Sequence, residues 1–512
     1  MNTKKLVLDP QNPVECAEKF RERRRPYVWS PQVRWWWDYE ERQHCYKEVL
    51  QATMQRDMQD FLNHALKRVE TPTGVIIEPF KPFPSDVRTI LESLQNEVHR
   101  TPDRAKPPAW LDDKHDGIDP HLILPVQNGL LNIKTRALLD HTPSFFCTYC
   151  LPLGYYPEQE VPEMWLRCLN EWFGGRQHLI DALQEAFGYT LSTNRNMQKI
   201  FFLRGVKGSG KGTTMRVLSA LCGQGQTASV PISVLGEKYG LENCLDKLLL
   251  LITDMTLSDR KTTDLAAERL KAISGQDLCG VRRVGITSVP SVYLPGQFWI
   301  GANILPNFGD SADALNRRLL VWPFDYSFEG IEDYDLSEKL TSPEMLAGIL
   351  NWSLVGLDRL LERGKFEEWP ESREAKRALL ALSNPVAAFI EACCELRGDA
   401  EAEKQVLYRA FSDFSAERGM THMPDNTFSE KLREAVGAMG RMLGERRPRT
   451  ADPKRRRPTM WRGIALNAEC CARYYEQDEE LVGLGMEGLE AVLRDADGFP
   501  IVKKEAASVF DD

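Results

Sequence analysis

The chain has 512 residues, of which 42% are hydrophobic and 27% are charged, an ordinary composition for a folded globular protein. Its apolar runs, such as Leu248–Ile252, are far shorter than the roughly 18 residues of a membrane-spanning helix, and the N-terminal residues lack a signal-peptide pattern. We therefore expect no membrane association and a cytoplasmic protein, built from about three to four structural units.

The negative charge of the chain is concentrated at one end. The formal net charge is −9, and the segment Glu476–Asp512 alone carries 11 acidic and 3 basic residues. The remaining chain is almost neutral, so the overall charge does not argue against a nucleic-acid partner.

The 12 cysteines do not form a recognisable framework. Only Cys147 and Cys150 have the C-x-x-C spacing of half a zinc site, and a structural zinc site requires a second such pair or spaced histidines. We expect reduced, mostly buried thiols and no zinc.

The N-terminal third is predicted to be mainly helical. Residues 1–25 are expected to form a flexible lead-in, and residues 26–195 a helical domain with a small β element around an Asn128–Gly129 turn. The helical candidates are Tyr46–Val69, Val87–Leu94 and Trp165–Phe187. The three tryptophans Trp35–Trp37 are compatible with stacking on bases, although packing in a helical core is the commoner role.

From Lys199 onwards the pattern changes to alternating strands and helices. Strands are expected at Ile200–Leu203, Leu248–Ile252 and Phe298–Gly301, with helices at Met215–Leu221 and Thr263–Ile273 between them. This alternation predicts a parallel α/β core over residues 196–380. A last helical unit over residues 381–470 is expected to contain helices at 389–396, 406–417 and 427–439 and a strand at 461–466, followed by the acidic tail 471–512.

A glycine-rich loop follows the first strand of the α/β core and precedes a helix, which is the context of a phosphate-binding loop. Its candidate nucleotide-binding residues are Gly205, Gly208, Ser209, Gly210, Lys211, Gly212, Thr213 and Thr214. Backbone N–H groups of such a loop wrap phosphates, and Lys211 is placed to reach the β- and γ-phosphates. Because Gly212 occupies the position where Ser or Thr usually follows the lysine, Thr213, either alone or together with Thr214, is expected to serve Mg²⁺.

Polar residues at the ends of two later strands are candidates for the hydrolysis of ATP. Asp254 follows Leu248–Ile252 and is expected to hold the Mg²⁺ shell together with Thr213 or to polarise water. Asn303 follows Phe298–Gly301 and is expected to orient the attacking water or to contact the γ-phosphate. Arg317 or Arg318 is the candidate arginine finger, and the sequence does not choose between them. A finger acting on a neighbouring subunit implies a ring.

The segment Arg446–Arg457 holds seven basic residues and one acidic residue in twelve positions. The basic residues are Arg446, Arg447, Arg449, Lys454, Arg455, Arg456 and Arg457. The segment lies between a predicted helix and a predicted strand, where the wing of a winged helix falls, and its charge favours contact with DNA phosphates over a merely solvated loop.

The order of these motifs resembles the superfamily-3 helicases, specifically the helicase part of the phage/plasmid primase–helicases related to the poxvirus enzyme. The matching segments are 205–213, 248–254, 270–283, 299–306 and 316–324, with 125–132 and 184–189 upstream. The resemblance implies an AAA+-like P-loop ATPase core in a homo-oligomeric, hexameric ring on single-stranded DNA, an N-terminal collar and a winged-helix-like C-terminal domain. It also implies a DNA-contacting hairpin near Arg282 and Arg283, and a separate primase or polymerase partner where priming is needed.

The expected function is an ATP hydrolase that acts as a replicative DNA helicase of a phage, plasmid or other mobile element in a bacterial host. Its partners would be single-stranded and forked DNA, and its cofactors ATP and Mg²⁺. Two alternatives remain open. One is a DNA-stimulated ATPase that assembles an origin or packaging complex without unwinding, and the other is a nucleotide kinase.

Overall fold

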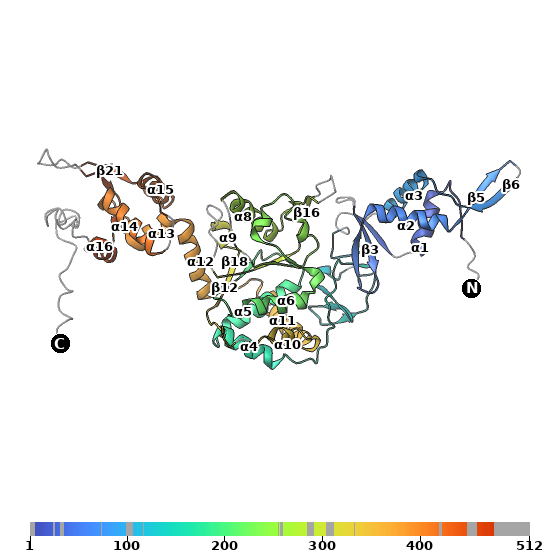
Figure 1. The fold of residues 1–512 in the computed structure, drawn as a ribbon, viewed down its shortest axis with the longest axis horizontal. Coiled ribbons are helices and arrows are strands. Elements are labelled where there is room, and N and C mark those ends of the chain that lie inside the picture. The colour runs from blue at the N-terminus through green and yellow to red at the C-terminus, as the bar shows by residue number, and fades with distance from the viewer. Residues whose placement is uncertain are drawn as a thin grey trace, which may run out of the picture. The chain divides into compact units, whose positions relative to one another are not determined.

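The computed structural model describes residues 6–23, 26–30, 35–72, 74–98, 106–115, 117–253, 255, 260–283, 291–303, 312–331, 333–418, 422–447 and 458–475. The chain divides into two compact units (Figure 1). The first comprises Met1–Pro306 and Arg317–Glu374, and the second comprises Asn307–Asn316 and Ala375–Asp512. The division near residue 375 lies close to the predicted domain boundary at 380, whereas the predicted boundary at 195 falls inside the first unit.

The N-terminal part of the first unit mixes helices with small sheets. Its elements are β1 (Val7–Leu8), α1 (Pro13–Arg23), β2 (Tyr27–Ser30), β3 (Trp35–Glu40), β4 (Cys45–Val49), α2 (Gln51–Asn63), β5 (Leu66–Thr71), β6 (Gly74–Pro79) and α3 (Pro84–Glu97). They form the sheets β1-β5-β6 and β2-β3-β4. The prediction of a mainly helical collar is therefore wrong for this part of the chain.

Two local predictions fail here for the same physical reason. The expected flexible lead-in contains helix α1, which buries Cys16, Ala17 and Phe20 in a core with α2 and α3. The expected helix Tyr46–Val69 is helical only over α2, because Tyr46 pairs with Tyr39 across β3 and β4, and Val69 pairs with Ile76 across β5 and β6. Tertiary pairing overrides the local apolar period at both ends.

Two of the three tryptophans, Trp36 and Trp37, are buried in the described structure. Trp36 is fully buried, and its indole Nε1 donates a hydrogen bond to Oε1 of Gln51 at 2.7 Å. Trp37 is also buried, and its ring lies edge-on to Phe146. Trp36 is fully enclosed, so the commoner, structural role applies to it, whereas Trp37, although buried, also lines a cavity.

A small β region leads into two helices before the central sheet. Its elements are β7 (Ala109–Trp110), β8 (Ile123–Val126), β9 (Gly129–Asn132), β10 (Leu138–Leu139), β11 (Phe145–Phe146), α4 (Glu163–Phe173) and α5 (Gln177–Leu191). Strands β8 and β9 pair antiparallel, which confirms a hairpin here, although its turn is Gln127–Asn128 and Gly129 already belongs to β9. The expected helix Trp165–Phe187 is interrupted, because Gly174 and Gly175 adopt φ angles of 57° and 73° and end α4.

A five-stranded parallel sheet forms the centre of the first unit. Its strands are β12 (Ile200–Gly205), β13 (Thr227–Ser229), β14 (Leu249–Ile252), β17 (Gln297–Ala302) and β18 (Leu319–Phe324), in the order β13-β14-β17-β12-β18. Every neighbouring pair is parallel, which confirms the predicted α/β core. The segments between them include α6 (Lys211–Cys222), α7 (Ile232–Leu235), α8 (Arg260–Ser274), β15 (Cys279–Gly280), β16 (Ser291–Val292) and α9 (Ala312–Asn316).

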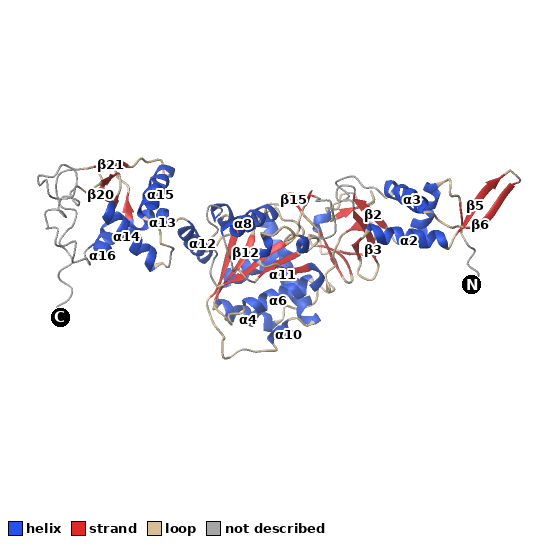
Figure 2. Ribbon diagram, turned by 45° about the horizontal axis from the view of Figure 1, so that its top comes forward, coloured by secondary structure: helices blue, strands red, loops and turns tan. Residues whose placement is uncertain are grey.

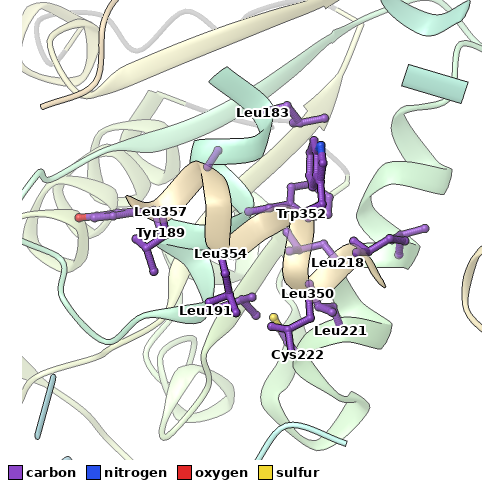
Figure 3. Close-up of a cluster of buried hydrophobic side chains, with 14 of the residues drawn as sticks. Leu183, Tyr189, Leu191, Leu218, Leu221, Cys222, Leu350, Trp352, Leu354 and Leu357 are labelled. Carbon is purple, nitrogen blue, oxygen red and sulfur yellow. The ribbon is translucent and has the colours of Figure 1, made fainter. Parts of the chain in front are cut away.

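Helices cover both faces of this sheet. Helices α5, α6, α10 (Leu336–Leu340) and α11 (Pro343–Arg363) lie on one side and α8 on the other (Figure 2). Leucine side chains of α5, α6 and α11 interlock in the core beneath the sheet (Figure 3). Helices α5 and α11 approach closely, since a Cβ on Gly188 would lie 2.3 Å from the carbonyl oxygen of Ser353. Buried Glu185 fixes the same pair of helices through Arg359 (2.7 Å) and Arg363.

The second unit combines helices with a small antiparallel sheet. After α12 (Pro370–Ser383) follow α13 (Pro385–Cys393), β19 (Cys394–Glu395), β20 (Glu401–Glu403), α14 (Lys404–Glu417), α15 (Asp425–Ala438), β21 (Gly444–Arg446), β22 (Met460–Arg462), β23 (Ala465–Leu466) and α16 (Ala468–Tyr475). Strands β20, β22 and β21 form the sheet around a core of phenylalanines and Trp461. Two predicted helices match α14 and α15 within two residues. The third, expected at 389–396, ends at Cys393 because β19 begins there.

No helix among the described residues is long and apolar enough to span a bilayer. The predicted acidic tail lies outside the described residues, apart from its first positions in α16.

Candidate functional site

The glycine-rich loop connects the end of β12 to the start of α6 and has a backbone that only glycine accommodates. Gly208 and Gly210 have φ angles of 70° and 97°. A Cβ on Gly210 would lie 2.6 Å from Nε1 of Trp172, and one on Gly205 would lie 2.1 Å from the carbonyl oxygen of Phe324. The loop is therefore packed closely against its surroundings while its backbone remains accessible at the N-terminus of α6, as an anion site requires.

Lys211 is the first residue of α6, and its ammonium group points back towards the glycine-rich loop. The Nζ atom donates hydrogen bonds to the carbonyl oxygen of Gly205 (2.6 Å) and to Oγ of Ser209 (3.1 Å), and it also contacts the carbonyl oxygen of Val206. Within the described residues, these partners are all neutral oxygens. Partial burial lowers the pKa of Lys211. An incoming phosphate would supply the anion that this cation lacks.

The hydroxyl groups of the loop have different surroundings. Ser209 is buried and donates to the carbonyl oxygen of Val206 at 2.7 Å, and Thr214 is buried and donates to that of Gly210 at 3.0 Å. Thr213 is only partly buried, and its Oγ1 accepts a hydrogen bond from Arg216 at 3.2 Å. Gly212 and Thr213 line the adjacent cavity, whereas Thr214 faces the interior. Of the two threonines considered as magnesium ligands, Thr213 is the accessible one.

A cavity of about 560 Å³ opens beside this loop. Its other wall is formed by α4, including Cys168 and Trp172, and by the segment after β18, including Ile331 and Tyr334. The side chains of Ile331 and Tyr334 are 77% and 89% exposed, which is unusual for large apolar groups beside a cavity. Sequence reasoning missed these residues, because isolated apolar residues in a polar loop give no signal until the fold places them beside the glycine-rich loop.

Asn303 lies at the same edge of the sheet as the glycine-rich loop. Ala302, the last residue of β17, pairs with Arg204 of β12, so exposed Asn303 follows directly beside Gly205. Strand β14 ends at this edge too, since Ile252 pairs with Ile300. Asp254, the predicted second magnesium ligand, lies outside the described residues.

The two candidate arginine fingers lie at the opposite edge of the sheet. Arg317 and Arg318 precede β18, whose first residue Leu319 pairs with Ile200 at the start of β12. At about 3.3 Å per residue, the length of β12 separates this edge from Gly205 by roughly 16 Å. The two arginines therefore cannot serve the glycine-rich loop of their own chain.

Arg317 and Arg318 also differ from each other. The Arg318 guanidinium donates to the carbonyl oxygen of Lys271 and to Oγ of Ser274 (3.0 Å), both on α8. Arg317 is exposed, and its backbone carbonyl accepts a hydrogen bond from Nζ of Lys199 at 2.9 Å. Of the two, Arg317 has the side chain that is available to another molecule, and Arg318 has a structural role.

Arg282 and Arg283 follow β15, which pairs antiparallel with β16. Arg283 is largely buried, and its Nη1 lies 2.6 Å from Oε1 of Glu48 on β4, with Glu242 at 3.8 Å from Nε. Arg282 is exposed. The expectation of a pair of arginines gripping DNA is thus corrected, because carboxylates of the same chain already bind Arg283, which leaves Arg282 as the exposed member. Residues 284–290 lie outside the described residues.

The predicted basic segment begins at the end of β21. Arg446 is exposed and forms an ion pair with Glu401 at 3.3 Å, and Arg447 is exposed. Arg449, Lys454, Arg455, Arg456 and Arg457 lie outside the described residues. Two of the seven basic residues of this segment, Arg446 and Arg447, are therefore described, and Arg446 is already paired with Glu401.

The cysteines are free thiols. Cys147 is fully buried, and burial raises the pKa of Cys150 to about 12. Among the described residues, no cluster of three or more histidine, cysteine or acidic side chains has a geometry that would hold a metal ion.

The parallel sheet and the loop at its carboxyl edge define an α/β protein with a candidate phosphate-binding site. Three segments match protein-family models: residues 85–174 match "D5 N terminal like", residues 203–318 match a family of unknown function (DUF5906), and residues 382–447 match "Poxvirus D5 protein-like". The two D5-type matches flank the central sheet. They confirm the resemblance to the poxvirus-type primase–helicases on both sides of the central sheet.

Solved structures of the C-terminal region of NrS-1 are also similar to this chain. Two of them have sequence identities of 10% and 12% and TM-scores of 0.46 and 0.49. They cover 88% and 89% of this chain and 100% of the other. Comparison with curated protein sequences finds no match.

Proposed function

We propose that this chain is the subunit of a ring-forming, ATP-driven DNA helicase of a phage, plasmid or other mobile element. The observation that carries the proposal is the distribution of candidate residues over the sheet. Lys211, Thr213 and Asn303 gather at one edge, and Arg317 is exposed at the other. A site assembled from the two opposite edges requires two subunits.

The carboxyl edge of the sheet suits a magnesium-bound nucleoside triphosphate. The glycine backbone and the N-terminus of α6 would hold the phosphates, Lys211 would neutralise their charge and Thr213 would ligate Mg²⁺ together with Asp254. Asn303 would orient the attacking water. The bound metal would supply charge neutralisation for the transferred phosphoryl group. Ile331 and Tyr334 would cover the base, which accounts for their exposure in the cavity wall.

Arg317 would complete the site of the adjacent subunit. A head-to-tail interface joins two different surfaces, and it closes into a ring when the rotation between subunits allows it. In such a ring each glycine-rich loop would face the Arg317 of a neighbour. This arrangement couples hydrolysis to the relative position of subunits, and a hexamer is the ring size that the superfamily-3 resemblance implies.

The second unit would contact DNA. Helices α13, α14 and α15 are followed by β21 and β22, and the segment that joins these strands carries the basic run Arg446–Arg457. A helical unit with a basic loop between two antiparallel strands is the arrangement expected of a winged helix. Counterion release from DNA phosphates would then contribute to binding.

The test combines three measurements on the complete chain: ATP hydrolysis with and without single-stranded DNA, separation of a forked duplex and the mass of the particle. The proposal predicts a ring-sized particle whose hydrolysis is stimulated by DNA and which separates the strands. Stimulated hydrolysis without strand separation would favour an assembly factor. A monomer that hydrolyses ATP regardless of DNA would contradict both the ring and the DNA contact.

A further inference from the structure

A second cavity, of about 360 Å³, lies at the amino edge of the central sheet. Lys247 and Leu248 precede β14 and line it, and Pro295 lines it just before β17. The glycine-rich loop follows the carboxyl end of β12, a parallel strand of the same sheet. The two cavities therefore lie at opposite edges, and the second one is separate from the candidate ATP site. Its volume lies within the usual range of small-ligand pockets.

The floor of this cavity is aromatic. Trp37 and Tyr149 line it and are only 4% and 5% exposed, so their rings are held rigidly by the surrounding core. Tyr293, just beyond β16, lines the same cavity at its exposed rim. Rings fixed in this way favour a flat, unsaturated ligand, because stacking gains contact area at little cost in side-chain entropy.

Two polar groups line the cavity. The hydroxyl of Tyr149 is fully enclosed and forms no hydrogen bond with the described residues. Asp246 lines the cavity in a left-handed conformation with φ of 55°, and its carboxylate experiences the charges of Glu48, Lys247 and Arg283. Enclosed polar groups are nearly always paired in folded proteins, so the unpaired hydroxyl of Tyr149 indicates a ligand with a polar edge.

A positively charged side chain, Lys106, lies at the rim of this cavity. The ammonium group of Lys106 lies 3.7 Å from the centre of the Tyr293 ring. The adjacent His121 is fixed by a hydrogen bond between its Nδ1 and Oγ1 of Thr193 at 3.0 Å. Lys106 forms no ion pair with a carboxylate among the described residues, so its charge is available to an anionic group at the mouth of the cavity.

We propose that this cavity binds one nucleotide, with its base between Trp37 and Tyr293, its polar edge at Tyr149 and Asp246, and its phosphate at Lys106. The carboxylate of Asp246 accepts hydrogen bonds from a ring N–H or exocyclic amino group, which a hydrocarbon or a fatty acid lacks. This function is separate from ATP hydrolysis. The nucleotide is either a free mononucleotide or one residue of a single strand, since both present the same base and phosphate.

The experiment uses the complete chain carrying Lys211→Ala, so that the glycine-rich loop contributes little to binding. Calorimetry measures the binding of each of the four ribonucleoside monophosphates and of a mixed-sequence single-stranded 15-mer. Saturable binding is expected, and both Tyr149→Phe and Asp246→Asn should weaken it about ten-fold, because the first removes the hydroxyl and the second replaces the charged, acceptor-only carboxylate by a neutral amide. Asp399→Asn, an exposed site in the second unit, is the control and should change nothing.

Competition between a monophosphate and the 15-mer distinguishes a free mononucleotide from a nucleotide of a single strand. Displacement of a bound monophosphate by the 15-mer identifies a nucleotide of a strand, and binding of monophosphates without displacement identifies a free ligand. Near-ultraviolet circular dichroism verifies the fold of each variant, and Leu278→Trp, at the exposed rim, is a second way to obstruct the cavity. The proposal is overturned if no monophosphate or oligonucleotide binds, or if binding is unchanged in Tyr149→Phe, Asp246→Asn and Leu278→Trp.

Discussion

The two edges of the central sheet differ in how many candidate site residues of one chain lie together there. At the carboxyl edge, the glycine-rich loop, Lys211 and Asn303 lie together, and the ammonium of Lys211 is already bound by oxygens of its own loop. At the amino edge, Arg318 is fixed to α8 while Arg317 is exposed. In the proposed function, the first edge would bind ATP, and the exposed Arg317 of the second edge would act on another subunit.

This difference shows that the register of the strands determines which motifs lie close together, which the order of the motifs along the chain does not. All five strands are parallel, so residues that follow strands and residues that precede them are necessarily separated by the length of a strand. Motif order along the chain places Arg317 close behind Asn303, yet the register places them at opposite edges. An arginine finger at Arg317 would therefore have to act on the glycine-rich loop of a neighbouring subunit.

The largest expected effect is at the carboxyl edge. Lys211→Ala should reduce ATP hydrolysis by at least ~10³-fold, because it removes the cation that faces the phosphates. Lys207→Ala is the matched control on the same loop, since Lys207 is 86% exposed and pairs only with Glu329 at 3.4 Å. Steady-state hydrolysis of both variants, with circular dichroism to verify folding, measures the contrast. Equal loss in both would mean that Lys211 has no special role.

At the amino edge, Arg317→Ala should lower the turnover number about 10³-fold while nucleotide affinity is retained, as expected for an arginine finger supplied in trans. Arg318→Ala should instead lower the thermal stability, because it removes two hydrogen bonds to α8. Nucleotide binding, turnover and the melting temperature of each variant separate the two roles. A reversed pattern would assign the finger to Arg318.

A smaller effect is expected from the loop backbone. Gly210→Ala places a Cβ 2.6 Å from Nε1 of Trp172 at a φ of 97°, so the loop must shift, and nucleotide affinity should fall about ten-fold. Gly225→Ala is the control, since nothing lies within 4 Å of a Cβ there. Binding of a fluorescent ATP analogue measures the difference. Unchanged affinity in Gly210→Ala would show that the loop shape does not determine binding.

The smallest effect concerns stability at the second cavity. Burial and the nearby Glu48 raise the pKa of Asp246 to about 6, so the folded state favours its protonated form. The stability that this proton binding contributes is present at low pH and is lost as the pH rises through about 6. Asp246→Asn cannot ionise and should therefore gain about 1.4 kcal/mol on the wild type between pH 5 and pH 8. Thermal unfolding at both pH values tests this, and an equal difference at both would contradict it.

The sequence predicted the central sheet and the loop because their signals are local. The apolar strand Ile200–Leu203, the glycines after it and the helix after them lie within one short stretch, and each is specified by its own residues. The same holds for helices α14 and α15, whose apolar faces repeat at helical spacing.

The predictions that failed depend on contacts between distant segments. Phe20 belongs to a core with Met54 and Leu94, so the charged residues around it misled the expectation of a flexible lead-in. Arg283 has the sequence context of an exposed basic pair, and only the fold brings Glu48 to it from 235 positions away. The walls of both cavities likewise come from separate segments, and no local pattern marks Tyr334 or Tyr149 as a lining residue.

The central claim is that each hydrolytic site combines Lys211 of one subunit with Arg317 of the next. Lys211→Ala and Arg317→Ala chains, tagged differently, are produced together in equal amounts and the mixed particles are purified through both tags. Each variant alone should be inactive, and the mixed particles should recover about a quarter of the wild-type rate, since random mixing restores about one interface in four. Mixed particles as inactive as either variant alone would contradict the claim.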